Sequence, residues 1–411
     1  MSSRSILGVA TQIAINSTSP RAKFPGMSGE SGNASTTEAN QTFTSRVATT
    51  FSNLSVNINA TGTSRNVQFR KNGANGSQVV TIGDTLSGIF TDTTHTDSIV
   101  SGDTFDLQFN FTTGTAPTFW SAVMTSLTSG VDSPSQFFNS ALGVVANISK
   151  NFYNAVGSNT GSSTEAQNQI KIRAPGKARS MQVVVSANSV NASSTAVSRL
   201  NTADGAQSIT IGALASGLFE DSTNTDTLAA TDLFCVALTA GSTAGITYGF
   251  KYQIDSTTSL FEIAGSNGFT NVAFSASTRF FAIFGSVESA TVTTTESQAQ
   301  IVPGIPLLLS FFRMRIDGNT MTGTTTFKLR KNGVDAKQNL SVATILTGLF
   351  EDTTNIDLSD STTNLNYSIS GGTSGNIQFN FYAITASEFI WQQLEDTSSL
   401  LRMWKNEIVG Y

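Results

Sequence analysis

Three pairs of aspartates at one fixed spacing are the residues in this chain whose types could do chemistry. The pairs are Asp92/Asp97, Asp221/Asp226 and Asp352/Asp357. Threonine and asparagine side chains stand between the two acids of each pair, and Ca²⁺ binds about six to eight such oxygens. The stretch nevertheless lacks the residue order and the closing glutamate of an EF-hand loop. We favour the other interpretation, in which the carboxylates accept hydrogen bonds from backbone N–H groups in a turn.

The chain has one histidine and one cysteine, which restricts the catalytic chemistry open to it. Asn224 and Asn355 replace His95 in the other two stretches, and both residue types tolerate turn conformations, so we expect a turn role for all three. A single His and a single Cys form neither a zinc site nor a Cys/His dyad. Cys235 lies in an alternating run and is expected to be a buried small apolar residue. We therefore predict no enzyme, no cofactor and no metal.

The acids belong to a signature that occurs three times, at residues 88–97, 217–226 and 348–357. A unit of about 130 residues is the size of a domain and too long for a solenoid repeat. The boundaries expected from this repeat are 1–130 with a polar N-terminal arm, 131–275, 276–387, and a tail at 388–411. The apolar runs 6–10, 141–145 and 281–285 are expected to open the three copies.

Alternating apolar residues and turn signals around each signature predict β-strands. Asn72-Gly73 and Asn332-Gly333 are strong hairpin signals, because a type I′ turn needs positive φ at both central positions. The nearest match in the second copy is Asn188, which implies an inserted loop near residues 191–204. Short strands at close spacing predict three tandem β-sandwich or jelly-roll-like domains, an all-β fold.

Composition supports this fold class and excludes several functions. Charged residues are 12% of the chain, which is too few for long exposed helices. No Lys/Arg cluster indicates a nucleic-acid surface, and no apolar run is long enough for a membrane span. The first residues lack the apolar core of a secretory signal. The absence of a second cysteine fits folding in a cytoplasm.

The tail has a different pattern from the repeats. Apolar residues at helical spacing predict a short amphipathic helix that Ser387 caps and Glu388 opens. Its candidate docking residues are Ile390, Leu394, Leu401, Trp404 and Ile408. We expect this helix to dock on a sheet edge or a neighbouring subunit. The alternatives are a self-associating coiled coil and a membrane-surface helix, although its polar face is not basic.

The Arg-Lys-Asn-Gly hairpin followed by the signature, at residues 70–97 and 330–357, resembles β-sandwich repeats in structural proteins of tailed bacteriophage virions. The middle copy matches only in part, and the resemblance covers under half of the chain. It implies a non-enzymatic structural protein of the virion exterior, of the capsid decoration (cement), collar or fibre type, assembled in the host cytoplasm. The implied partners are other virion proteins, in a homo-oligomer. The alternative is a surface adhesin or carbohydrate-binding module that recognises a host glycan.

Overall fold

A computed structural model describes most of the chain as an all-β protein, which confirms the expected fold class. The described residues are 4–11, 21–23, 37–59, 62–83, 86–114, 120–129, 133–140, 143–145, 148–154, 156, 161–266, 271–274, 277–286, 292–372 and 374–389. Among them, no helix is long and apolar enough to cross a membrane.

The first sandwich packs two antiparallel sheets face to face. One sheet has the strand order β1-β9-β4-β7, and the other has the order β2-β8-β5-β6 with β3 also paired to β8. The elements are β1 (Arg4–Thr11), β2 (Arg21–Lys23), η1 (Glu38–Asn40), β3 (Phe43–Thr44), β4 (Thr49–Ile58), β5 (Gly62–Lys71), β6 (Ala74–Ile82), β7 (Gly88–Ile99), β8 (Thr104–Gly114) and β9 (Trp120–Thr128). A four-stranded and a five-stranded sheet that exchange strands in this order form a jelly roll.

The second sandwich repeats the topology, with sheets β10-β19-β14-β17 and β12-β18-β15-β16. Its elements are β10 (Ser135–Asn139), β11 (Gly143–Val145), β12 (Asn151–Tyr153), η2 (Glu165–Gln167), β13 (Ile170–Lys171), β14 (Gly176–Asn188), β15 (Ser194–Leu200), β16 (Ala203–Ile211), β17 (Gly217–Leu228), β18 (Leu233–Thr239) and β19 (Ile246–Ser256).

The third sandwich has sheets β23-β20-β29-β24-β27 and β22-β28-β25-β26. Its elements are β20 (Leu260–Ser266), β21 (Asn271–Phe274), β22 (Arg279–Phe281), β23 (Gly285–Ser286), α1 (Glu296–Ala299), β24 (Leu307–Asn319), β25 (Thr325–Lys331), β26 (Val334–Val342), β27 (Gly348–Ser359), β28 (Leu365–Ser370) and β29 (Gly375–Glu388).

Strand pairing moves the boundary between the second and third copies. The repeat pattern put residues up to 275 in the second copy, but β20 and β21 pair with β29 of the third sandwich. The second sandwich therefore ends with β19. The strands that open the copies are β1, β10 and β20, and the apolar runs 141–145 and 281–285 form only short additional strands. Edge strands are hard to align from sequence because their partners lie far along the chain.

The expected loop insertion in the second copy is wrong. Its counterpart of the Asn-Gly turn is Asn201-Thr202, which joins β15 to β16 and precedes Gly217 by the same distance as Asn72 precedes Gly88. The φ values are 50° at Asn201 and 71° at Thr202, close to the 50° and 73° of Asn72 and Gly73. The hairpin was missed because a β-branched residue occupies a position where a type I′ turn strongly favours glycine.

Replacing Thr202 by glycine is expected to stabilise the second sandwich by about 1 kcal/mol, because a non-glycine residue in the left-handed region costs roughly 1–2 kcal/mol. Hydrogen exchange in β15 and β16 measures this gain. The matched control is Gly333→Ala, where φ is 79°, and this change is expected to have the opposite sign. Equal stabilities in the wild type and Thr202→Gly would contradict the strain at this turn.

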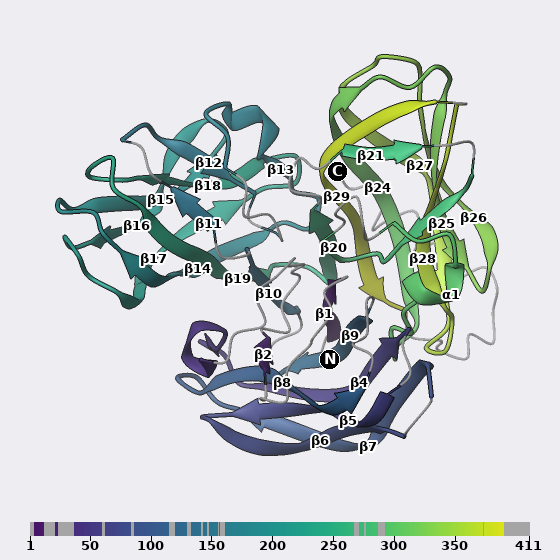
Figure 1. Ribbon diagram of the computed structural model, residues 1–411, viewed down its shortest axis with the longest axis horizontal. Coiled ribbons are helices and arrows are strands. Elements are labelled where there is room, and N and C mark those ends of the chain that lie inside the picture. The colour runs from purple at the N-terminus through teal and green to yellow at the C-terminus, as the bar shows by residue number, and fades with distance from the viewer. Residues whose placement is uncertain are drawn as a thin grey trace.

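The three sandwiches surround a common centre at which β1, β10 and β20 meet (Figure 1). β1 and β10 lie at the edge of their sheets, β20 lies next to the short edge strand β23, and each of the three also packs against a neighbouring sandwich. In β1, for example, Leu7 belongs to the core of the first sandwich, whereas Ile6 joins the apolar cluster that fills the third.

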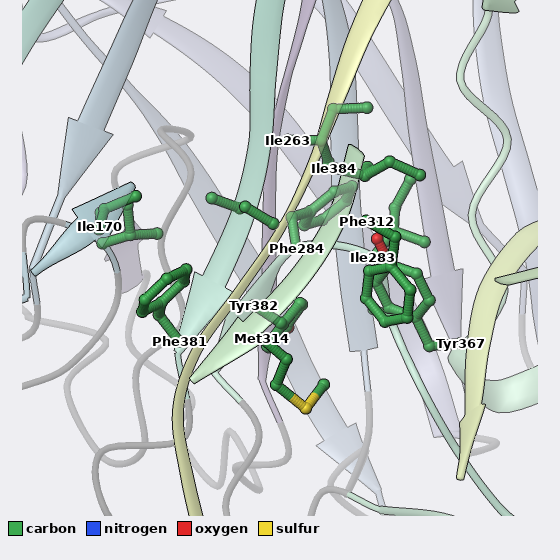
Figure 2. Packing of buried hydrophobic residues seen from close by; sticks show 14 of the residues in the cluster. Ile170, Ile263, Ile283, Phe284, Phe312, Met314, Tyr367, Phe381, Tyr382 and Ile384 are labelled. Carbon is green, nitrogen blue, oxygen red and sulfur yellow. The ribbon is translucent and has the colours of Figure 1, made fainter. Parts of the chain in front are cut away.

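The largest apolar cluster crosses between sandwiches. It fills the third sandwich and continues into the inner end of the second. In Figure 2, Ile170 of the second sandwich lies beside Phe381 of β29. The three copies therefore form one compact triangular body with shared core residues.

The expected tail helix begins where the structure has a strand. Ser387 and Glu388 are the last residues of β29 and pair with Leu308 and Leu307 of β24, so they do not cap a helix. The sheet extends to these two residues because the first residues of β24 pair with the last residues of β29. The proposed docking residues Ile390, Leu394, Leu401, Trp404 and Ile408 lie outside the described residues.

Candidate functional site

The signature aspartates connect the two sheets of each sandwich at its outer edge. They lie on β7, β17 and β27, whereas the N–H groups they bind lie mainly on β6, β16 and β26 of the opposite sheet. In the first copy, Asp97 accepts hydrogen bonds from the N–H groups of Ser77 at 2.7 Å and Gln78 at 2.9 Å. Asp92 accepts a further bond from Val79 N–H at 3.0 Å. These bonds occupy N–H groups that an edge strand would otherwise leave open to pairing with another chain.

The second aspartate of the other two signatures binds the opposite sheet in the same way. Asp226 of β17 accepts a hydrogen bond from the N–H group of Ala206 at 2.6 Å. Asp357 of β27 accepts bonds from the N–H groups of Lys337 at 3.2 Å and Gln338 at 2.9 Å. Both aspartates are buried, so their carboxylates are engaged with protein donors inside the sandwich.

A bulge in the strand that pairs with each signature marks the position of the first aspartate. The strand pairing shifts at this point in all three copies. The facing residues Asn53, Ser180 and Phe311 each have a φ of 53°. The two residues that follow Thr93, Ser222 or Thr353 each donate a backbone N–H hydrogen bond to the first aspartate of their copy. The turn interpretation predicts these bonds.

In the second copy these contacts change the acidity of Asp221. Burial raises its pKa, but bonds from the Asn224 side chain (2.9 Å) and from the N–H groups of Asn224 (3.0 Å), Ser208 (2.9 Å) and Thr223 (3.2 Å) outweigh burial. The net effect lowers the pKa of Asp221 to about 2. The pKa of Asp92 and of Asp352 is lowered for the same reason.

His95, Asn224 and Asn355 make equivalent contacts, which agrees with their expected turn role. The imidazole Nδ1 of His95 lies 2.9 Å from a carboxylate oxygen of Asp92. The Nδ2 groups of Asn224 and Asn355 donate to Asp221 and Asp352 at the same distance.

The lowered pKa of Asp221 predicts a specific loss of stability in acid. Because the folded carboxyl binds its proton more weakly than the unfolded one, its contribution is present above about pH 4 and is lost as the pH falls toward 2. Asp221→Asn is expected to cost about 1–3 kcal/mol at neutral pH, because an amide cannot accept all of these bonds. The variant is also expected to weaken the acid dependence.

Denaturant unfolding between pH 2 and 7 measures both effects. Asp360→Asn is the control, because Asp360 is exposed, and it is expected to follow the wild type. An Asp221→Asn curve that parallels the wild type at every pH would contradict the role of this carboxylate.

The expectation that the signature acids hold no metal stays a prediction. Within the described part of the chain, no group of three or more His, Cys, Asp or Glu side chains is gathered as a metal site would require. Calorimetric titration with CaCl₂ tests the six signature aspartates as weak calcium candidates. A bound metal there would have to displace the N–H donors. These candidates are Asp92, Asp97, Asp221, Asp226, Asp352 and Asp357.

Cys235 is buried, as expected. Burial and the neighbouring Glu165 carboxylate raise the pKa of its thiol well above the ordinary value. Because the reactive form of cysteine is the thiolate, Cys235 has the character of a structural residue.

An Arg–Glu pair that the sequence analysis missed recurs in all three copies. Each arginine precedes the hairpin turn and binds, through two bonds, a glutamate that begins a short helix. The pairs are Arg70–Glu38 (3.0 and 3.1 Å), Arg199–Glu165 (3.0 and 2.8 Å) and Arg330–Glu296 (2.8 and 3.0 Å). A Thr-Glu dipeptide at each helix start carried the signal. These pairs anchor the short helix whose following segment reaches the next sandwich.

The joint between the first and second sandwiches is polar. Lys251 Nζ of β19 donates to the backbone carbonyls of Asn40 (3.3 Å) and Thr42 (2.5 Å). Gln182 Nε2 donates to the carbonyl of Thr44 at 3.1 Å. Arg46 forms a two-bond ion pair with Glu220, which precedes Asp221 in the signature.

The joint between the second and third sandwiches has a similar arrangement but contains more charged side chains. Arg173 and Lys171 both bind Glu351, at 2.5 and 2.9 Å. Arg313 occupies the place of Gln182, and its Nε donates to the carbonyl of Lys171 at 2.8 Å. Its guanidinium also binds Glu262 at 2.6 Å.

Glu262 of β20 also connects the third sandwich to the second. Its second carboxylate oxygen accepts the N–H groups of Arg173 at 2.7 Å and Ala174 at 2.8 Å. The side chain of Arg313 is 0% exposed and that of Glu262 is 5% exposed. A buried ion pair of the third sandwich therefore lines this joint, and both of its residues bind the backbone of the second sandwich.

The joint that closes the ring, between the third and first sandwiches, uses neutral groups. Asn57 Nδ2 donates to the carbonyls of Ser297 and Gln300 at 2.8 Å each. Gly304 occupies the place of Arg46 and Arg173, and Thr91 replaces the signature glutamate. A Cβ at Gly304 would lie 3.0 Å from that of Asn53, and its φ is 75°, so a larger residue does not fit. Corresponding segments, residues 38–46, 165–173 and 296–304, thus meet the next sandwich at all three joints, as a threefold arrangement requires.

Comparison with solved structures shows a distant likeness. Neither the family models nor the curated proteins include a match to this chain. One solved structure, described as "The Triple Jelly Roll Fold and Turret Assembly in an Archaeal Virus", shares 13% sequence identity and has a TM-score of 0.20. The alignment covers 85% of this chain and 82% of that chain. A likeness at this level concerns the fold alone and carries no functional weight here.

Proposed function

We propose that this protein is a non-enzymatic structural component of the exterior of a virus particle. The observation that supports this proposal is the ring of three jelly rolls in one chain, joined by corresponding segments at each joint. Jelly rolls build viral capsid and lectin domains, and closed symmetric rings are the usual form of protein oligomers. One chain of this kind supplies the shape that three identical subunits would otherwise have to assemble.

The triangular arrangement favours a decoration or cement protein over a fibre or collar component. A fibre spacer gains length from copies placed in a line, whereas these copies share core residues around one centre. We propose that one chain lies at a local threefold position of a capsid shell, attached to other virion proteins and repeated over the surface. Assembly in the host cytoplasm agrees with its single buried cysteine.

The adhesin alternative keeps some support, because lectin domains also use the jelly roll. A glycan site of the expected kind needs exposed aromatic rings or an acid-lined hollow. The large hydrophobic side chains that are exposed in the described residues are all aliphatic, among them Leu214 and Ile345. A glycan array with the purified chain separates the two functions, since specific binding to one sugar class would favour the adhesin.

Antibody labelling of purified particles from the source tests the proposal. Antibodies raised against the β6–β7 and β16–β17 edges are expected to label the whole head. Label restricted to the neck or tail would make the protein a collar or fibre component. Particles without any label would remove the virion function.

A further inference from the structure

Asp106 of β8 distinguishes the first sandwich from the other two. It lies directly across from Arg70 in the pairing of β5 with β8. At the same cross-strand position, Cys235 faces Arg199 and Asn366 faces Arg330. The first copy therefore places a second acid beside its Arg–Glu pair, where the other copies have neutral residues.

The surroundings of Asp106 require a proton. The residue is 0% exposed, and neither carboxylate oxygen has a hydrogen-bond donor within the described part of the chain. Its side chain contacts the carboxylate of Glu38, which Arg70 already binds through two bonds. Two ionised carboxylates are only acceptors, so one proton must lie between them for the contact to be favourable.

Among the described residues, the charged groups that face Asp106 are Glu38 from η1, Arg70 from β5 and Lys251 from β19. Burial and the charge of Glu38 outweigh the two cations and raise the pKa of Asp106 to about 8. Asp106 therefore carries the proton at neutral pH and donates it to Glu38.

Glu38 is also the first residue of the segment that forms the joint to the second sandwich. The carbonyls of Asn40 and Thr42 bind Lys251, and Arg46 binds Glu220. A displacement of Glu38 is thus passed along a short, continuous stretch of chain to the contacts that hold two sandwiches together.

We infer that the proton shared by Asp106 and Glu38 is a latch that holds residues 37–46 against the second sandwich, and that losing it in alkali loosens this joint. An ionised Asp106 would be a fully buried negative charge in contact with the carboxylate of Glu38, and repulsion would push η1 outward. Because the folded carboxyl binds its proton more tightly than the unfolded one, stability falls as the pH rises from about 4 to about 8. This inference does not depend on the proposed virion function.

Hydrogen exchange of residues 37–46 in the full chain tests the latch, with wild type and Asp106→Asn compared at the same pH. The ratio of the wild-type rate to the variant rate at pH 4, where Asp106 holds its proton whether the joint is closed or open, is the baseline. Because opening releases the proton at any pH between about 4 and about 8, this ratio is expected to rise by about 30-fold or more from pH 4 to pH 8 and to level off above pH 8. A ratio that does not change between pH 4 and pH 8 would overturn the inference.

Asn366→Asp supplies an independent test, which also applies if Asp106→Asn fails to fold. This change places an acid beside Glu296 and Arg330 in the third sandwich, so it should create a second latch there. Residues 296–304 are then expected to exchange faster in alkali than they do in the wild type. Unchanged exchange of this segment in the folded variant would overturn the inference as well.

Discussion

Replacing Phe137 by alanine is expected to lower the free energy of unfolding of the first sandwich by about 3–5 kcal/mol, the usual cost of emptying a large aromatic site in a core. Phe137 belongs to β10 of the second sandwich, yet it packs into the core of the first. Its ring lies 5.1 Å from that of Phe43 and 5.2 Å from that of Phe105 in edge-to-face contacts. The variant should therefore damage the sandwich to which its own strand does not belong.

Hydrogen exchange resolved by strand is the measurement, and Phe138→Ala is the matched control. Phe138 is the next residue of β10 and stacks on Tyr252 of the second sandwich at 5.2 Å. Phe137→Ala should accelerate exchange in β4 and β8, whereas Phe138→Ala should accelerate exchange in β14 and β19. The same pattern from both variants would contradict the shared core.

Replacing Arg313 by glutamine is expected to cost about 3–5 kcal/mol, because removing one partner leaves Glu262 as an uncompensated buried charge. The second sandwich provides the comparison, since the residues at the corresponding positions, Gln182 and Phe137, are buried and uncharged. The double variant Arg313→Gln with Glu262→Gln likewise leaves no charge at this site. It is expected to recover much of the lost stability.

A double-mutant cycle from denaturant unfolding measures this coupling. A coupling energy of several kcal/mol would show that charge neutrality at the joint matters more than the presence of the ions. Additive losses in the two single variants would contradict the pair as a coupled unit. Arg4, which lies 3.6 Å from Glu388 and is 45% exposed, serves as the control, and Arg4→Gln is expected to change stability by at most about 1 kcal/mol.

The features that could be predicted from sequence are those with local causes. The Asn-Gly turns follow from the φ values that glycine permits, and the alternating phenylalanines follow from the period of a strand. The signature aspartates were interpreted as acceptors of N–H groups, and the structure has them in that role. Their part in joining two sheets was not visible, because the donors lie on a strand whose position depends on the fold.

The joints could not be predicted because they depend on which surfaces meet. Arg46 and Arg173 stand in no shared motif, and Gly304 takes their place in the third copy. Phe137 looks like an ordinary core residue of the second copy, although it fills the first. The middle hairpin could not be recognised from sequence, because the surrounding sheet imposes a turn conformation that threonine disfavours at Thr202.

A cryo-EM reconstruction of particles from the source tests whether this protein decorates a capsid. We expect a triangular density of three jelly rolls on the outer surface, with one chain at each local threefold position and β1, β10 and β20 along its axis. Particles whose reconstruction has no such density, or in which each threefold position holds three chains, would contradict it.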